Sequence, residues 1–193
     1  MRTYSKAVHA AVVAASAAAL AVVSPAPAAF AAEVTIRVVP AYSATKPEPS
    51  HKFVCPTNQV LTGRSHYGDE NADTTYTCSW IFINDEQVQV SIGDWSLRYT
   101  ESNSNYSSPP DQALVGRMHV WDENGDTWYL PASLSWRGQT VRLIDPVWTG
   151  NLKESKHNYQ TDTEGRRVLI GRAHSGDENG YTRYQHAYVT LDA

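Results

Sequence analysis

Residues 116–129 read GRMHVWDENGDTWY, and the chain carries two close copies of this stretch. One copy is GRSHYGDENADTTY at residues 63–76, and the other is GRAHSGDENGYTRY at residues 171–184. The three align without a gap as Gly-Arg-x-His-x-x-Asp-Glu-Asn-(Gly/Ala)-x-Thr-x-Tyr, and their first glycines are 53 and 55 residues apart. Repetition at such a period is typical of a fold assembled from copies of one supersecondary unit. We therefore expect the chain from about Thr35 onward to form three units of about 53 residues.

The similarity extends outward from these stretches. Residues 101–106 (ESNSNY) match residues 154–159 (ESKHNY), and residues 34–42, 88–95 and 141–148 correspond in position. The third unit ends at Ala193 without a further copy of the last segment. We therefore expect residues 34–42 to replace a strand missing from the third unit, by pairing within the chain or as an edge strand in a partner's sheet.

The local sequence around each copy favours β-strands. Aliphatic and β-branched runs precede or begin the copies at residues 60–62, 114–115 and 168–170. Asn-Gly is typical of hairpin turns, and the alternating Thr-x-Tyr predicts a return strand. Residues 102–111 and 150–165 are polar and predict loops. The expected fold class is all-β, with a closed pseudo-threefold structure of the β-trefoil or β-prism type.

The first 31 residues are typical of a secretory signal peptide. Arg2 and Lys6 precede an Ala/Val-rich run, and Ala29-Phe30-Ala31 supplies small residues for cleavage after Ala31. We expect residues 32–52 to form an N-terminal strand and linker, and residues 53–193 to form the three-unit β-domain. No later segment predicts a membrane span. The localisation expected from this pattern is extracellular.

Charge and cysteine content agree with export. Residues 1–31 hold two of the 16 basic residues and none of the 20 acidic ones, so the remainder carries a formal charge of −6. No basic cluster appears, which argues against a nucleic-acid partner. Cys55 and Cys78 are the chain's two cysteines, and an oxidising compartment predicts a disulfide between them.

The repeated motif suggests three interpretations. Its Arg and His share one face of a strand, and its Asp follows at the turn. The candidate ligand-binding residues are Arg64, His66, Asp69, Arg117, His119, Asp122, Arg172, His174 and Asp177. In the first interpretation they are scaffold: Asp caps the turn, Arg pairs with Glu, and His binds backbone. In the second, Arg, Asp and Asn bind sugar hydroxyls while Trp or Tyr stacks on the ring. In the third, Asp69, Glu70 and Asn71 and their equivalents hold calcium through hard oxygens.

The scaffold interpretation is favoured, so no cofactor is expected. Zinc is disfavoured because the three histidines fall in separate units. Catalysis is disfavoured because an active site needs different residues in different roles, whereas a repeat supplies the same residues three times. We therefore expect the protein not to be an enzyme.

Two families resemble parts of this chain. Cys55-Pro56, Ser65, His66, Glu70 and Tyr76-x-Cys78 resemble a dermatopontin-type unit, although Asp-Glu-Asn replaces that family's usual Glu-Asp-Arg. The layout of an Ala-rich signal peptide, a strand-like leading segment and a small acidic β-domain is similar to the adaptor subunit of actinobacterial umbrella toxin particles. That resemblance implies a protein that joins a lectin subunit to a stalk protein through a strand near its N-terminus.

The function expected from these features is a secreted, non-enzymatic adaptor that links co-secreted protein subunits. Its candidate partner-binding residues are Val34, Ile36, Val38 and Tyr42, which alternate along the N-terminal strand. The alternative is a secreted lectin that binds carbohydrate through the repeated motif.

Overall fold

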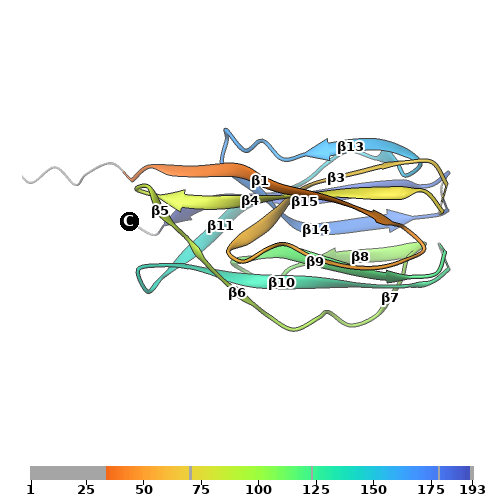
Figure 1. The fold of residues 1–193 in the computed structure, drawn as a ribbon, viewed down its shortest axis with the longest axis horizontal. Coiled ribbons are helices and arrows are strands. Elements are labelled where there is room, and N and C mark those ends of the chain that lie inside the picture. The colour runs from red at the N-terminus through yellow and green to blue at the C-terminus, as the bar shows by residue number, and fades with distance from the viewer. Residues whose placement is uncertain (1–33, 70, 123, 178, 192–193) are drawn as a thin grey trace, which may run out of the picture. The chain divides into compact units, whose positions relative to one another are not determined.

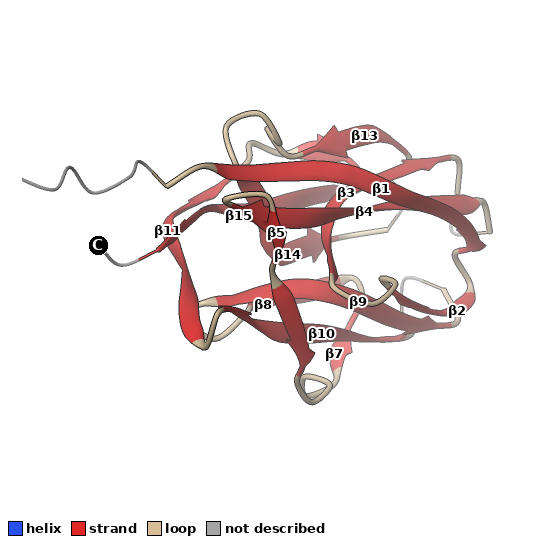
Figure 2. Ribbon diagram, turned by 60° about the vertical axis from the view of Figure 1, so that its left-hand side comes forward, coloured by secondary structure: helices blue, strands red, loops and turns tan. Residues whose placement is uncertain are grey.

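The computed structural model describes residues 34–69, 71–122, 124–177 and 179–191. The expected signal peptide lies outside this part, as do the turn glutamates Glu70, Glu123 and Glu178. Every regular secondary-structure element in this part is a β-strand, so the protein is all-β, as expected (Figures 1 and 2). None of the described residues belongs to a helix long and apolar enough to cross a membrane.

Four strand positions recur along the chain, and they define three units. The first hairpin strands are β3 (Gln59–Tyr67), β9 (Gln112–Val120) and β14 (Arg167–Ser175). The return strands are β4 (Asp73–Ile83), β10 (Asp126–Trp136) and β15 (Tyr181–Leu191). Short strands precede each hairpin: β2 (Ser50–Val54), β8 (Asn103–Ser107) and β13 (Lys156–Gln160). The outer strands are β1 (Ile36–Pro47) in unit 1, β6 (Gln89–Ile92) and β7 (Tyr99–Thr100) in unit 2, and β11 (Gln139–Trp148) and β12 (Leu152–Lys153) in unit 3. The short β5 (Glu86–Gln87) pairs antiparallel with the end of β4.

Antiparallel pairing follows one rule in all three units. The outer strands pair with the return strand of their own unit: β1 with β4, β6 and β7 with β10, β11 and β12 with β15. The short strands instead pair with the first hairpin strand of another unit: β2 with β9, β8 with β14, and β13 with β3. The short strand of each unit therefore pairs with the first hairpin strand of the next unit, and that of the third unit pairs with the first hairpin strand of unit 1. The sheets are open, and a two-residue contact of β10 with β11 joins two of them.

A bulge and a glycine mark the place where neighbouring units approach. The pairing of each hairpin shifts just before its motif glycine, at Gly63, Gly116 and Gly171. A Cβ at Gly116 would lie 2.6 Å from the carbonyl oxygen of Phe53, and one at Gly171 would lie 2.5 Å from that of Tyr106. No side chain fits at such distances, so glycine is required where the short strand of the preceding unit passes.

The buried residues form two clusters. One is aliphatic and includes Val60, Ile81, Leu134 and Val168. The other is half aromatic and contains the disulfide between Cys55 and Cys78, whose Cα atoms are 5.8 Å apart. The predicted disulfide is therefore confirmed, and it is consistent with an extracellular protein.

The pairing corrects two expectations. Unit 3 has its outer strand, because residues 141–148 pair with β15, the return strand of unit 3. They were expected to complete unit 2. The N-terminal strand pairs instead with β4 of unit 1, within its own chain. Residues 102–111 and 150–165 were also expected to be loops, yet they contain β8, β12 and β13. Their polar side chains alternate with buried ones, a pattern that composition alone hides.

Candidate functional site

The three motif arginines meet three buried glutamates in a closed ring of ion pairs, which we call the Arg–Glu ring. Its order is Glu48, Arg117, Glu101, Arg172, Glu154, Arg64 and back to Glu48, with successive N–O distances of 2.6, 2.8, 2.6, 3.2, 2.8 and 3.2 Å. Each arginine contacts glutamates of two units. The ring therefore links all three units through charge pairs.

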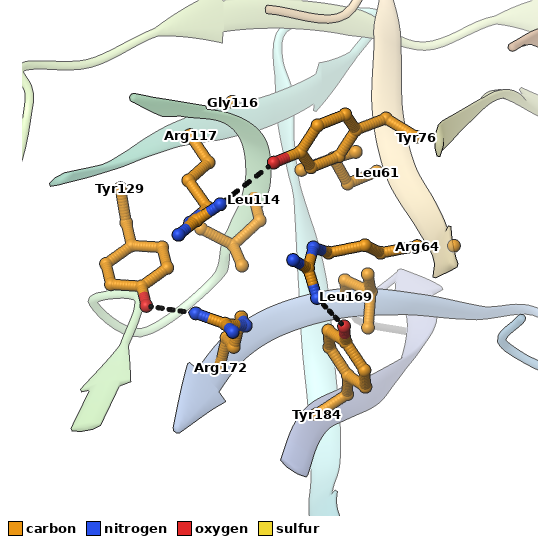
Figure 3. A pocket seen from close by; sticks show the side chains of 11 residues that line it. Leu61, Arg64, Tyr76, Leu114, Gly116, Arg117, Tyr129, Leu169, Arg172 and Tyr184 are labelled. Atoms are coloured by element: carbon orange, nitrogen blue, oxygen red, sulfur yellow. Dashed lines mark hydrogen bonds between the residues drawn. The ribbon is translucent and has the colours of Figure 1, made fainter. Parts of the chain in front are cut away.

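The motif tyrosines complete the Arg–Glu ring. Arg117 donates to the hydroxyl of Tyr76 at 3.2 Å, Arg172 to Tyr129 at 3.3 Å and Arg64 to Tyr184 at 3.2 Å (Figure 3). A second polar residue lies within hydrogen-bond distance of each hydroxyl: His51, Ser104 and His157 at 2.7, 3.1 and 2.8 Å. These contacts satisfy phenol groups that would otherwise be buried without partners.

Burial and ion pairing oppose each other in this ring. Burial alone would raise the pKa of Glu48, but Arg117 and Arg64 outweigh it and hold that pKa well below its usual value. Burial likewise disfavours charge on Arg64, but Glu154 and then Tyr184 and Glu48 keep its pKa well above the usual value. All six groups are therefore ionised, and the ring carries no net charge.

The nearby histidines behave differently. Burial, together with the positive charge of Arg117, lowers the pKa of His51 to about 4. The same two causes lower the pKa of His119 to about 4, and burial with Arg64 does so for His157. These histidines are neutral near pH 7, so the charge balance of the ring is undisturbed.

A small cavity lies between the three units, next to the ring arginines (Figure 3). Its volume is about 20 Å³, and each unit contributes the motif's Arg and Tyr and a leucine to its lining, the leucines being Leu61, Leu114 and Leu169. A space of this size holds about one water molecule. The arrangement therefore suits packing of the three units against one another rather than binding of a ligand.

The structure separates the candidate ligand-binding residues into two groups. Arg64, Arg117 and Arg172 and the histidines His66, His119 and His174 are buried. His66 and His174 lie within hydrogen-bond distance of the backbone oxygens of Asp69 and Gly176. By contrast, Asp69, Asp122 and Asp177 are exposed, and each accepts a hydrogen bond from the backbone of the Asn two residues later. The motif is thus a scaffold on its inner side and a set of turns on its outer side.

The ring glutamates were not recognised from the sequence, where the arginines were expected to pair with a Glu of the motif. Their signal is visible nevertheless. Glu101 and Glu154 begin the matching six-residue segments, and Glu48 lies 53 residues before Glu101. Recurrence of a charged residue at the period of a buried motif indicates that it too is buried.

Of the proposed partner-binding residues, Val38 is in the core and Ile36 is half-buried, whereas Val34 and Tyr42 are exposed. Among residues 34–69, 71–122, 124–177 and 179–191, no three His, Cys, Asp or Glu side chains converge as metal ligands would.

Comparison of the chain with protein-family models, curated proteins and solved structures returned no match.

Proposed function

We propose that this chain is a secreted, non-enzymatic adaptor that binds partner proteins through the edges of its sheets, above all through β1. The observation that carries the proposal is the position of β1 in its sheet. This twelve-residue strand pairs with β4 on one side and ends the sheet on the other. Such an edge offers main-chain groups to an added strand.

The exposed apolar side chains support the same function. Val34 lies two residues before β1 and Tyr42 lies at its middle, and their exposed fractions are 43% and 44%. The corresponding outer segments of units 2 and 3 carry Ile92, Leu97, Ile144 and Val147, which are exposed as well. A molecule with an apolar outer edge on each unit is suited to joining several subunits, as an adaptor in a co-secreted toxin particle would.

The proposed architecture is a pseudo-threefold β-prism. Its support is the shared pairing rule and the shared register, in which Arg64, Arg117 and Arg172 stand opposite Tyr76, Tyr129 and Tyr184. In a prism the outer strands would lie at equivalent edges, which is the arrangement that an adaptor with several docking edges needs.

Site-specific photocrosslinking tests the adaptor function. A photoreactive amino acid at position 42, in a tagged chain secreted by its own producing cells, is expected to form a covalent product with a co-secreted protein. The same amino acid at Tyr67 serves as the control, because Tyr67 is an exposed tyrosine at the end of β3 rather than on β1.

Two results would reject the adaptor proposal. One is the absence of any product from position 42 in a properly folded, secreted chain. The other is the same product in equal yield from both positions, which would indicate contact without a specific edge. A loss of the product on Val34→Lys, with an unchanged melting temperature, would support docking at β1.

The lectin alternative keeps less support in its original form. The arginines and histidines assigned to sugar hydroxyls are buried and engaged in the ring and its surroundings. Only the turn aspartates of that set are exposed.

A further inference from the structure

A polar groove of about 290 Å³ lies over β8, β14 and β15, and none of its described lining residues belongs to the Arg–Glu ring or to β1. Its walls include Asn103 and Asn105 of β8, Tyr181 and Arg183 of β15, and Asn151 before β12. Ala173 and Ser175 of β14 line the groove between these walls. A volume near 300 Å³ is at the lower end of the range for small-molecule sites.

The sequence of the central strand explains the hollow. In the sheet, Asn105, Ala173 and Arg183 stand in one row, and Asn103, Ser175 and Tyr181 stand in the next. The middle residue of each row is small and its neighbours are long, so the flanking side chains rise above the centre. At the corresponding central positions unit 2 places the larger Met118 and Val120, and unit 1 places Ser65 and the much larger Tyr67.

Two polar residues of the lining, Ser104 and His174, are engaged with Tyr129 and with the backbone of Gly176, whereas its described asparagines are not engaged. Within the described part of the chain, no hydrogen bond engages the side-chain amides of Asn103, Asn105 or Asn151. The guanidinium of Arg183 lies over the ring of Trp148 at 5.3 Å, a cation–π contact. Tyr181 is 52% exposed, so about half of this residue is accessible to a ligand.

We propose that this groove binds a neutral carbohydrate. A sugar hydroxyl both donates and accepts hydrogen bonds, and each Asn amide offers both functions in one group. The apolar C–H face of a sugar ring packs against an aromatic ring such as that of Tyr181. No acidic residue is among the described residues lining the groove, and Arg183 is its one permanent cation, so the chemistry favours an uncharged polyol over a metal ion or a multiply charged anion.

A glycan array probed with the labelled chain (residues 32–193) tests this site, followed by calorimetry on the neutral oligosaccharide bound best. We expect Tyr181→Ala to weaken that binding roughly tenfold or more, as removal of an aromatic anchor does. Asn105→Ala should weaken it as well. Ala173→Met places the side chain of Met118 at the corresponding position and should abolish binding by filling the groove.

Tyr67→Ala is the matched control, because Tyr67 is an exposed tyrosine on the unit 1 hairpin. It should leave binding unchanged, and all four variants should keep the melting temperature within a few degrees. The proposal is overturned if no neutral glycan is bound, if only acidic glycans are bound, or if Tyr181→Ala binds as well as Tyr67→Ala. Its failure would leave the adaptor proposal intact, since Tyr42 and Tyr181 lie in different sheets.

Discussion

Trp121 holds a backbone conformation that the other two units give to glycine. Its φ is 70°, and the equivalent residues are Gly68 with φ 124° and Gly176 with φ 95°. A bulky residue in this region is strained by about 1–3 kcal/mol. The side chain is 75% exposed, so burial within the chain returns little of that cost.

Replacing Trp121 by glycine should therefore stabilise the fold. The relief of strain exceeds the added freedom of the unfolded chain, which costs about 0.4–1 kcal/mol. We expect the free energy of unfolding of Trp121→Gly to rise by about 1 kcal/mol in urea titration. A decrease of similar size would mean that the indole makes a stabilising contact.

The buried histidines make stability depend on pH. Unfolded histidine titrates near pH 6.5, whereas folding lowers the pKa of His51, His119 and His157 to about 4. As the pH falls from about 6.5 to about 4, the unfolded chain takes up protons that the folded chain does not. The free energy of unfolding should thus fall through this window, by on the order of a few kcal/mol per histidine.

The chain itself offers a variant that tests this pH dependence. Unit 2 has Ser104 where the other units have His51 and His157, and Ser104 lies 3.1 Å from its tyrosine hydroxyl. The double variant His51→Ser/His157→Ser should show a shallower loss of stability between pH 6.5 and 4 in urea titrations. An unchanged slope would assign the acid sensitivity to other groups.

Among the strands, β9 shows most directly how the units depend on one another. β2 of unit 1 passes Gly116 so closely that a Cβ there would lie 2.6 Å from a carbonyl oxygen. Gly116→Ala should lower the free energy of unfolding by about 1–3 kcal/mol through overpacking. Gly138→Ala is a control with open space around its Cβ but a positive φ of 79°, and should cost about 1 kcal/mol or less. Equal costs would indicate that close approach at Gly116 is relieved without strain.

How far the sequence predicts these elements depends on whether a signal is local. The hairpin strands follow from alternation, and the disulfide follows from the pair of cysteines. The Asn-Gly pairs mark the turns, but the left-handed backbone conformation lies at Gly68, Trp121 and Gly176 instead. The assignment of β11 to the unit after it could not be predicted, because spacing does not reveal which hairpin a strand joins. The Arg–Glu ring was likewise missed, since Arg64 and its partner Glu154 are 90 residues apart, while a nearer glutamate follows in the motif.

At the scale of the whole molecule, the Arg–Glu ring joins all three units through buried charge pairs. Removing one member leaves buried charges without partners, which costs about 3–5 kcal/mol. Arg117→Met should therefore lower the free energy of unfolding by at least that amount. Arg98→Met breaks an exposed ion pair with Asp126 and should cost no more than about 1 kcal/mol. Similar losses in the two variants would show that the ring contributes no more than a surface pair.

The exchange of short strands has a consequence for a unit on its own. One unit contributes one ring arginine, one ring glutamate and one short strand, and each needs a partner from another unit. Excised from the chain, a single unit would leave that strand and half of its charge contacts unmatched. Three identical copies could supply partners for every one of these strands and charges, so such a fragment should fold only as a homotrimer. Its melting temperature should therefore rise steeply with protein concentration. Covalent linkage of the three units removes this dependence and lets each outer face diverge while the interior stays threefold.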